Sequence, residues 1–269
     1  MEGRFLACYE EWLGIQEADL DELLQAISTR HGNRDWREAE LRELVERCMR
    51  HYEEYHERRR GLVRDDGPTF FCPPWCNSFE NSMLWAGGCR PSMFIRLIYS
   101  LSSSGLEAHL DTSTGRAVSS HGEGMVGLSS SQLARVNELH QATLQEEEKI
   151  TSQMATLQEN VADGPLLPIV KRRQMWQWSG TSRVENGGGD AEVEAAMEEY
   201  TESMEGLVEE ADQLRLGTAR TLVLEILTSK QAVELLVAAK QLQLSVHDSP
   251  NSNPISHAVP NLLDDLRLM

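Results

Sequence analysis

The side chains best able to do chemistry in this sequence are its five cysteines and eight histidines. Cys72 and Cys76 flank a short proline-rich segment and Cys89 follows, but no Cys or His pair completes a zinc site at a usual spacing. His51 and His56 are five residues apart, which places them on different faces of a helix. We therefore expect unreactive thiols, with a redox-sensitive pair as the alternative, and two histidines at the boundary of a core.

Motifs for catalysis are absent from the sequence. It has no Ser/His/Asp nucleophile elbow, no phosphate-binding loop, no HExxH helix and no paired-carboxylate motif in a recognisable frame. The acidic runs have the spacing of solvated helix faces. The sequence therefore predicts that the protein is not an enzyme.

The charge balance is strongly acidic, with a net charge of -18 from 43 acidic and 25 basic residues. Such a surface repels a phosphate backbone, so we expect no autonomous nucleic-acid binding. The basic runs at 58–60 and 171–173 are short, and we interpret them as helix ends or linker charges, with a local basic patch as the alternative. No apolar run approaches the roughly 20 residues of a membrane span, and the first residues lack a secretory h-region, so we expect an intracellular protein with reduced thiols.

Helical periodicity dominates the elements that must position these side chains. From Phe5 to Ile27, apolar residues recur at spacings of three, four and seven residues, which predicts a helix. The same spacing predicts helices at about 36–60, 129–162, 191–216 and 228–246. Residues 222–227 are also predicted to be helical. Asn77 with Glu80 predicts a capping box, and Pro91 predicts the start of another helix after a Gly-Gly-Cys-Arg-Pro elbow. The fold prediction is all-α, a multi-helix bundle.

The same pattern predicts two long irregular connections within this bundle. They are Ser-, Gly- and Thr-rich or lack periodicity, and we expect flexible stretches at about 103–127 and 163–190. The predicted organisation is one domain over residues 4–247 and a loose, proline-containing tail over 248–269.

One segment carries a family likeness. Residues 75–99, with Asn77, Glu80 and the run Trp85-Ala86-Gly87-Gly88-Cys89-Arg90-Pro91-Ser92, resemble the domain shared by delay-of-germination proteins and TGA-type bZIP transcription factors. Further blocks agree over roughly residues 4–247. They are Phe5/Tyr9/Trp12, His51-Tyr52-Glu53-Glu54-Tyr55, Leu128-Ser129 to Gln132-Leu133 with Glu146-Glu147-Glu148, and Ala211-Asp212-Gln213-Leu214-Arg215.

The resemblance implies a helical regulator of seed dormancy and abscisic-acid responses that binds partners. The implied partners are type 2C protein phosphatases, bZIP/TGA-type factors and a second copy in a homodimer, and the implied location is the nucleus and cytoplasm. Because no basic region or zipper precedes the domain here, the sequence is similar to the stand-alone branch, and a transcriptional role would require a DNA-binding partner. The alternatives are a haem- or fatty-acid-binding sensor, or a co-regulator that dimerises with TGA-type factors.

Four residues of the first helix are the partner-binding candidates: Tyr9, Glu10, Trp12 and Leu13. Tyr and Trp are common anchors of protein interfaces. The alternative is that Trp12 fills the bundle core.

Two further residues are ligand candidates. The resemblance implies a haem site at two histidines four apart near the end of the last helix, where this sequence has His247 at the second position and Gln243 at the first. A histidine at a helix C-terminus is also explained by the helix dipole. Arg90 is a candidate anion ligand beside the Gly-Gly elbow, and its alternative is an ion pair with a nearby Glu.

Overall fold

The computed structural model describes residues 2–28, 38–113, 127–161 and 188–248. Seven α-helices account for most of these residues, and no β-strand forms among them. Their order is α1 (Glu2–Ser28), α2 (Glu38–Asp65), η2 (Pro68–Phe71, a 3-10 turn), α3 (Ser78–Met83), α4 (Pro91–Ser113), α5 (Ser130–Val161), α7 (Gly188–Arg220), η4 (Thr221–Ile226, a π-helical turn) and α8 (Ser229–His247). The all-α prediction is confirmed.

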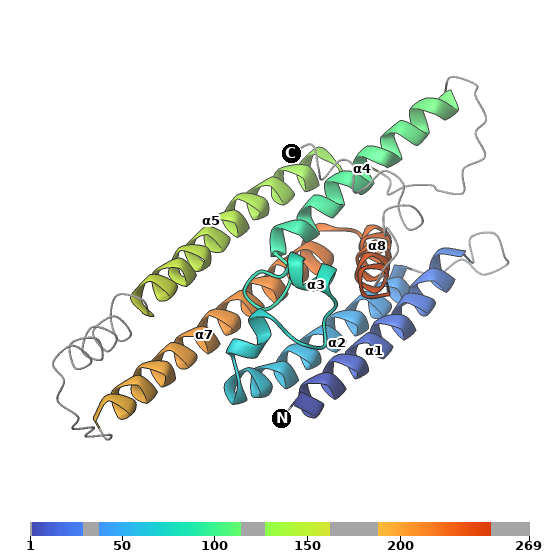
Figure 1. Cartoon of the computed structure of the whole chain (residues 1–269). Helices are drawn as coiled ribbons and strands as arrows, with labels where there is room; N and C mark the ends of the chain where they lie inside the picture. Colours follow the sequence, from blue (N-terminus) through green and yellow to red (C-terminus); the bar gives the residue numbers. More distant parts are fainter. Residues whose placement is uncertain (1, 29–37, 114–126, 162–187, 249–269) are drawn as a thin grey trace.

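Two long antiparallel pairs and one central helix define the architecture. Figure 1 shows α1 beside α2, and α5 beside α7, with α8 viewed nearly end-on between α4 and the α1–α2 pair. Helix α2 also packs against α7, which joins the two pairs, and α4 packs against α5, α7 and α8. The short helix α3 and the turn before α4 lie in front of this assembly (Figure 1).

The main core lies where α8 meets α1, α2, α4 and the π-helical turn. Leu23, Ile95, Ile98, Leu222 and Leu235 are fully buried there. Each comes from the apolar stripe of its helix, so burial of these stripes is the main force that assembles the bundle.

The capping box predicted at Asn77 and Glu80 is confirmed. Asn77 accepts hydrogen bonds from the amides of Phe79 and Glu80 and forms a capping box with Glu80, which starts α3. Thr228 and Gln231 form a second capping box that starts α8. Pro91 is the first residue of α4, as expected.

Three boundaries differ from the sequence prediction. Helix α2 continues through Gly61 to Asp65, because Leu62 and Val63 on its last turn are buried against neighbouring helices. Helix α4 continues to Ser113, so the stretch expected to be flexible from 103 begins as helix. The predicted helical residues 222–227 form a π-helical turn, with a backbone bond from the Leu227 amide to the Leu222 carbonyl.

Parts of the predicted organisation lie outside the described residues. These are 114–126 of the first expected flexible stretch, 162–187 of the second, and 249–269 of the tail. Helix α7 begins at Gly188, within the last residues of the second stretch.

Candidate functional site

The segment before α4 turns sharply at Trp85–Gly88. The Trp85 amide donates to the Gly88 carbonyl at 2.6 Å, and the Gly88 amide donates back to the Trp85 carbonyl at 3.1 Å. Both central residues have positive φ, 43° at Ala86 and 77° at Gly87. Positive φ at both central positions is the requirement of a type I′ turn, so the backbone here is held in a conformation that L-residues rarely adopt.

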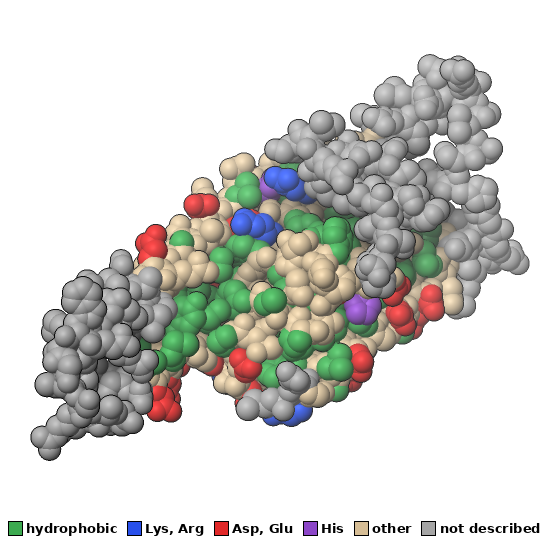
Figure 2. Space-filling model, in the orientation of Figure 1, with side chains coloured by type: hydrophobic (Ala, Val, Ile, Leu, Met, Phe, Trp, Pro, Cys, Tyr) green, Lys and Arg blue, Asp and Glu red, His purple; other side chains and the backbone are tan. Residues whose placement is uncertain are grey.

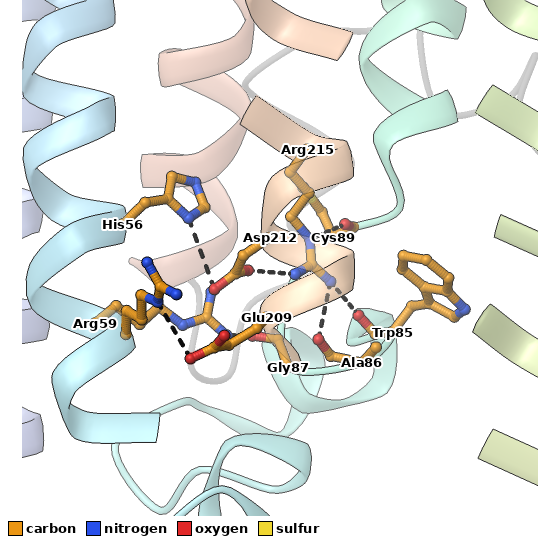
Figure 3. Close-up of polar contacts among 10 residues, drawn as sticks. His56, Arg59, Trp85, Ala86, Gly87, Cys89, Glu209, Asp212 and Arg215 are labelled. Carbon is orange, nitrogen blue, oxygen red and sulfur yellow. Dashed lines mark hydrogen bonds and ion pairs between the residues drawn. The ribbon is translucent and has the colours of Figure 1, made fainter. Parts of the chain in front are cut away.

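Two buried arginines hold this turn by its carbonyl groups. Arg215 on α7 donates to the carbonyls of Cys89 at 2.7 Å and Ala86 at 3.0 Å, and also to that of Trp85. Arg59 on α2 donates to the carbonyl of Gly87. Figure 3 shows both guanidinium groups reaching the turn from two different helices. The turn is therefore fixed through its backbone, at the junction of α2 and α7.

The paired glycines are explained by the closeness of these arginines. A Cβ atom at Gly87 would lie 2.8 Å from the Arg59 Nη2 atom, and one at Gly88 would lie 2.9 Å from the Arg215 Cζ atom. Any other residue would have to displace a buried guanidinium or accept a strained φ. The Gly-Gly pair thus allows the turn to pack closely against the arginines of α2 and α7.

Asp212 joins the two arginines. Its Oδ1 atom accepts from Arg59 Nη1 at 3.1 Å and from Arg215 Nη1 at 2.5 Å, and His56 Nδ1 lies 3.6 Å from Oδ2, longer than a hydrogen bond (Figure 3). Burial alone would raise the pKa of Asp212, but the Arg59 guanidinium, His56 and Arg215 hold it well below its usual range. The carboxylate stays charged and neutralises part of a buried cationic cluster.

Glu147 of α5 anchors the other side of the elbow. Its carboxylate is 1% exposed and accepts from the Ser92 amide at 2.7 Å and the Ser92 hydroxyl at 3.0 Å. An acceptor at the first turn satisfies amides that lack a partner within the helix, so Glu147 caps α4 from a distance. The indole of Trp85 donates to Thr151 on the same face of α5 at 3.0 Å.

Arg90, the predicted anion ligand, lies beside this carboxylate. Its Nη1 atom is 3.5 Å from Glu147 Oε2, its side chain is 45% exposed, and its guanidinium lies 5.3 Å from the Trp85 ring centroid. The structure therefore shows the ion pair with a nearby Glu. It also leaves about half of the Arg90 side chain in contact with solvent.

His247, the predicted haem ligand, lies in a second polar cluster. Its Nδ1 atom is 3.1 Å from Glu80 Oε1, which also accepts from the Tyr9 hydroxyl at 2.6 Å. Asn77 donates to the carbonyls of Val246 and His247, both at 3.0 Å. These contacts connect α1, α3 and the end of α8, so His247 has a clear structural role at the helix C-terminus.

The fit of this cluster to haem is poor. Gln243 stands one turn before His247, and within the described residues no three His, Cys, Asp or Glu side chains gather as a metal site. A second histidine, which the resemblance implies as the partner ligand, is replaced by an amide that binds iron weakly.

The four partner-binding candidates on α1 point to different sides. Trp12 and Leu13 are buried, with Trp12 stacked on Tyr55 at a centroid distance of 4.3 Å. Tyr9 is half-buried against Glu80, and Glu10 is exposed. The structure thus places Trp12 in the core, and of the four candidates only Glu10 lies fully on the surface.

A buried ion pair fixes α1 in this orientation. Lys240 of α8 donates to Gln16 at 2.7 Å and to Asp19 at 2.9 Å, and the Lys240 and Asp19 side chains are each 4% exposed. His51 of α2 contacts the other oxygen of Asp19 at 2.9 Å. The inward stripe of α1 is therefore partly polar, and its partners come from α2 and α8.

Sequence reasoning did not identify Arg59, Asp212 or Arg215 as a cluster. The sequence predicts a helix end or linker charge at residues 58–60, and Asp212 and Arg215 belong to a block that carries only a family likeness. A usable signal exists: Asp and Arg three residues apart lie on one helical face, and Ala211, Leu214 and Val208 beside them are apolar.

The cysteines do not form a shared site in the described residues. Cys48 is buried, Cys72 and Cys89 are exposed, and Cys8 and Cys76 are half-buried, all as free thiols. Burial and, to a lesser extent, the charge of Glu80 raise the pKa of Cys76 to about 12. Among the described helices, none combines the length and the apolar character of a membrane span.

Comparison with known proteins identifies the relatives of this chain. Residues 19–100 match the family model described as seed dormancy control. DOG1-like 3 of Arabidopsis thaliana is 37% identical over 245 residues, which cover 90% of this chain and 82% of that protein. RESPONSE TO ABA AND SALT 1 of the same plant is 29% identical over 247 residues, or 91% of this chain and 94% of that protein.

The likeness to TGA factors is also found. Transcription factor TGA2 of Arabidopsis thaliana is 26% identical over 238 residues, which cover 87% of this chain but 59% of TGA2. The Trp-Ala-Gly-Gly-Cys-Arg-Pro elbow and the helices that hold it are thus set in a chain whose match to DOG1-like 3 extends over nine tenths of its length. This chain belongs to the DOG1-like family.

Proposed function

We propose that this protein is a non-enzymatic regulator of seed dormancy and abscisic-acid signalling, and that it acts by binding other proteins, including type 2C protein phosphatases. The matched family model is described by seed dormancy control, and one relative is named for its response to abscisic acid and salt. The buried ionisable groups around the elbow bind to one another and to backbone carbonyls, which supports a structural role for them and not a catalytic one.

The observation that carries this proposal is the exposed outward stripe of α1. Four residues follow one another at helical spacing and are all exposed: Leu6, Glu10, Glu17 and Asp21. Leu6 is 41% exposed. The opposite stripe, with Trp12, packs against α2 and α8. A rigidly held helix with an apolar residue among carboxylates is suited to a partner with a basic, partly apolar surface.

Binding to a purified type 2C phosphatase, measured by isothermal titration calorimetry, tests the proposal. Glu10→Arg reverses a charge at the centre of the stripe without touching the core, and we expect the affinity to fall by about tenfold, or about 1.4 kcal/mol. Glu138→Arg, at an exposed position of α5, is the matched control and should bind like the native chain.

Two results would overturn the α1 proposal. One is an absence of binding by the native chain, and the other is equal binding by Glu10→Arg and native protein. Trp12→Ala is unsuitable for this experiment, since it removes a buried ring that stacks on Tyr55 and would lower the stability of the whole bundle.

The remaining expectations are proposals that the same preparation can test. Dimerisation, with a second copy or with a TGA-type factor, is measured by light scattering of the single and mixed proteins. A fluorescent fusion tests the proposed location in the nucleus and cytoplasm.

Haemin titration of the native chain and of His247→Ala tests the sensor alternative, which the contact between His247 and Glu80 does not favour.

A further inference from the structure

Helices α5 and α7 extend as a pair past the end of α2. Figure 1 shows both helices running beyond that point, side by side. Nearer the centre of the molecule α7 is covered from this side: Glu209 pairs with Arg64 of α2, and a Cβ atom at Gly67 would lie 2.6 Å from the Glu205 Cγ atom. Glu205 is about 25 Å along α7 from the first residue of the helix, Gly188. The first turns of α7 therefore lie beyond the reach of α2.

One apolar stripe runs along α7 from these first turns to the centre of the molecule. Its residues recur at alternating steps of four and three, and they are Val193, Met197, Tyr200, Met204, Leu207 and Ala211. This is the spacing of a coiled-coil seam. The last two residues of the stripe pack with Ile150 of α5, and Met154 and Leu157 continue the α5 side of the same cluster. The stripe therefore forms the seam between α7 and α5.

The seam becomes exposed where α2 no longer covers it. Along the stripe, Ala211 is fully buried, Met204 is 9% exposed and Met197 is 46% exposed. Four other residues of this part of the seam are half-buried: Met154, Leu157, Val193 and Tyr200. Figure 2 shows hydrophobic side chains gathered where α5 and α7 meet, with acidic side chains at the edges. Two helices alone leave one side of a seam uncovered, and a third helix can pack there.

The charge around this exposed seam is negative. Residues 193–214 contain eight acidic residues and no Lys or Arg, and residues 150–160 of α5 contain one Glu and no Lys or Arg. Four of these carboxylates are exposed and form no ion pair with the described residues: Glu194, Glu198, Glu199 and Glu202. Burial and the charges of Glu202 and Glu209 raise the pKa of Glu205, as expected where carboxylates are crowded together.

The charge of the seam selects its occupant. A second copy that paired through the same surface would place carboxylates against carboxylates, which is unfavourable. A helix with Lys or Arg beside its apolar stripe satisfies both the apolar seam and the acidic edges. We propose that the α5–α7 seam at residues 150–160 and 193–204 docks a basic amphipathic helix of another protein. This surface shares no residue with the outward stripe of α1, so the proposal does not rest on phosphatase binding.

Binding of a fluorescent peptide of about 18 residues, built from Leu at heptad seam positions and Lys elsewhere, tests this inference by anisotropy. We expect saturable binding at an ionic strength of about 0.15 M, and in Met197→Gln the affinity should fall by about tenfold. Leu133→Gln is the matched control, because Leu133 is 42% exposed near the other end of α5, and it should bind like the native chain. Replacing Glu194 and Glu198 together by Gln should weaken binding and reduce its dependence on salt.

Met197 is exposed, so the urea midpoint of Met197→Gln should match the native one and separate binding from folding. A peptide of the same composition in scrambled order, and one with Glu in place of Lys, should both bind more weakly. The proposal is overturned by the absence of saturable binding, by equal binding of native protein and Met197→Gln, or by equal binding of the scrambled peptide. Self-association in light scattering that Met197→Gln abolishes would assign the surface to a second copy instead.

Discussion

At the scale of single residues, Asp212 is the centre of the buried polar network. It is the carboxylate between two guanidinium groups that together hold four backbone carbonyls of the elbow. Removing one member of a buried charge cluster leaves the others without compensation, which costs more than the cluster itself contributes. The cost of changing Asp212 should therefore exceed that of any exposed ion pair of this protein.

Asp212→Asn is predicted to lower the free energy of unfolding by roughly 3–5 kcal/mol at neutral pH, as measured by urea denaturation. Glu146→Gln, which breaks the exposed pair with Lys149, should cost at most about 1 kcal/mol. An equal cost for the two variants would contradict the assigned role of Asp212.

The destabilisation caused by Asp212→Asn is predicted to depend on pH. The folded pKa of Asp212 lies below the unfolded value of about 3.9, so the stability it contributes is complete above that pH and is lost as the pH falls towards the folded pKa. The difference in stability between native protein and Asp212→Asn should therefore shrink below about pH 4. A constant difference from neutral to acid pH would show that the charge of Asp212 does not matter.

At the scale of elements, Asn77 connects two helix ends. Its side-chain oxygen caps the start of α3, and its amide nitrogen donates to the last carbonyls of α8. A single side chain thus satisfies backbone groups that both helices leave unpaired. The end of α8, where His247 lies, depends on a residue about 170 positions earlier.

Asn77→Ala is predicted to lower the free energy of unfolding by roughly 1–2 kcal/mol. It should also speed hydrogen exchange in the last turn of α8, since that turn loses the hydrogen bonds from Asn77 to its last carbonyls. Ser129→Ala, which removes the cap of α5 at Gln132, is the comparison and should leave exchange in α8 unchanged. Faster exchange in α8 in both variants would point to a general loss of stability.

The sequence predicted the elements whose signals are local. Asn77, Thr228 and Pro91 lie within a few residues of the helices they start, so their effect was visible in the sequence. The helix predicted to end at about residue 60 continues through Gly61. Glycine propensity favours a break there, while tertiary packing of Leu62 and Val63 keeps the helix intact. The Ser-rich residues after Leu101 also continue a helix, to Ser113, where composition favours an irregular connection.

The candidate sites were less predictable, because they depend on residues far apart in the chain. Arg59 and Asp212 are 153 residues apart, and no spacing rule in a single sequence connects them. Trp12 was correctly placed on an amphipathic helix, but its inward direction is set by Tyr55 of α2 and by Lys240, which binds Asp19 on the same stripe. The elbow was recognised from its residue types, while its function as a set of carbonyl acceptors required the structure.

At the scale of the whole molecule, the excess of negative charge acts on every part of the fold. A net charge of -18 creates repulsion between helices that salt screens. Raising the ionic strength from about 0.01 M to about 0.15 M shortens the screening length from about 30 Å to about 8 Å. We predict that the melting temperature rises over this range, as measured by calorimetry, and an unchanged or falling value would show that favourable ion pairs outweigh the repulsion.

The long separation between the elbow and its arginine on α7 has a consequence for synthesis of the chain. Cys89 and Arg215 are 126 residues apart, so a ribosome that makes about 5–20 residues per second needs roughly 6–25 s to supply the second arginine after the elbow has emerged. During this interval Arg59 and the elbow carbonyls have no Asp212 or Arg215 to bind. The nascent N-terminal half therefore waits in an incompletely folded state, and this is the stage at which chaperones have most access to it.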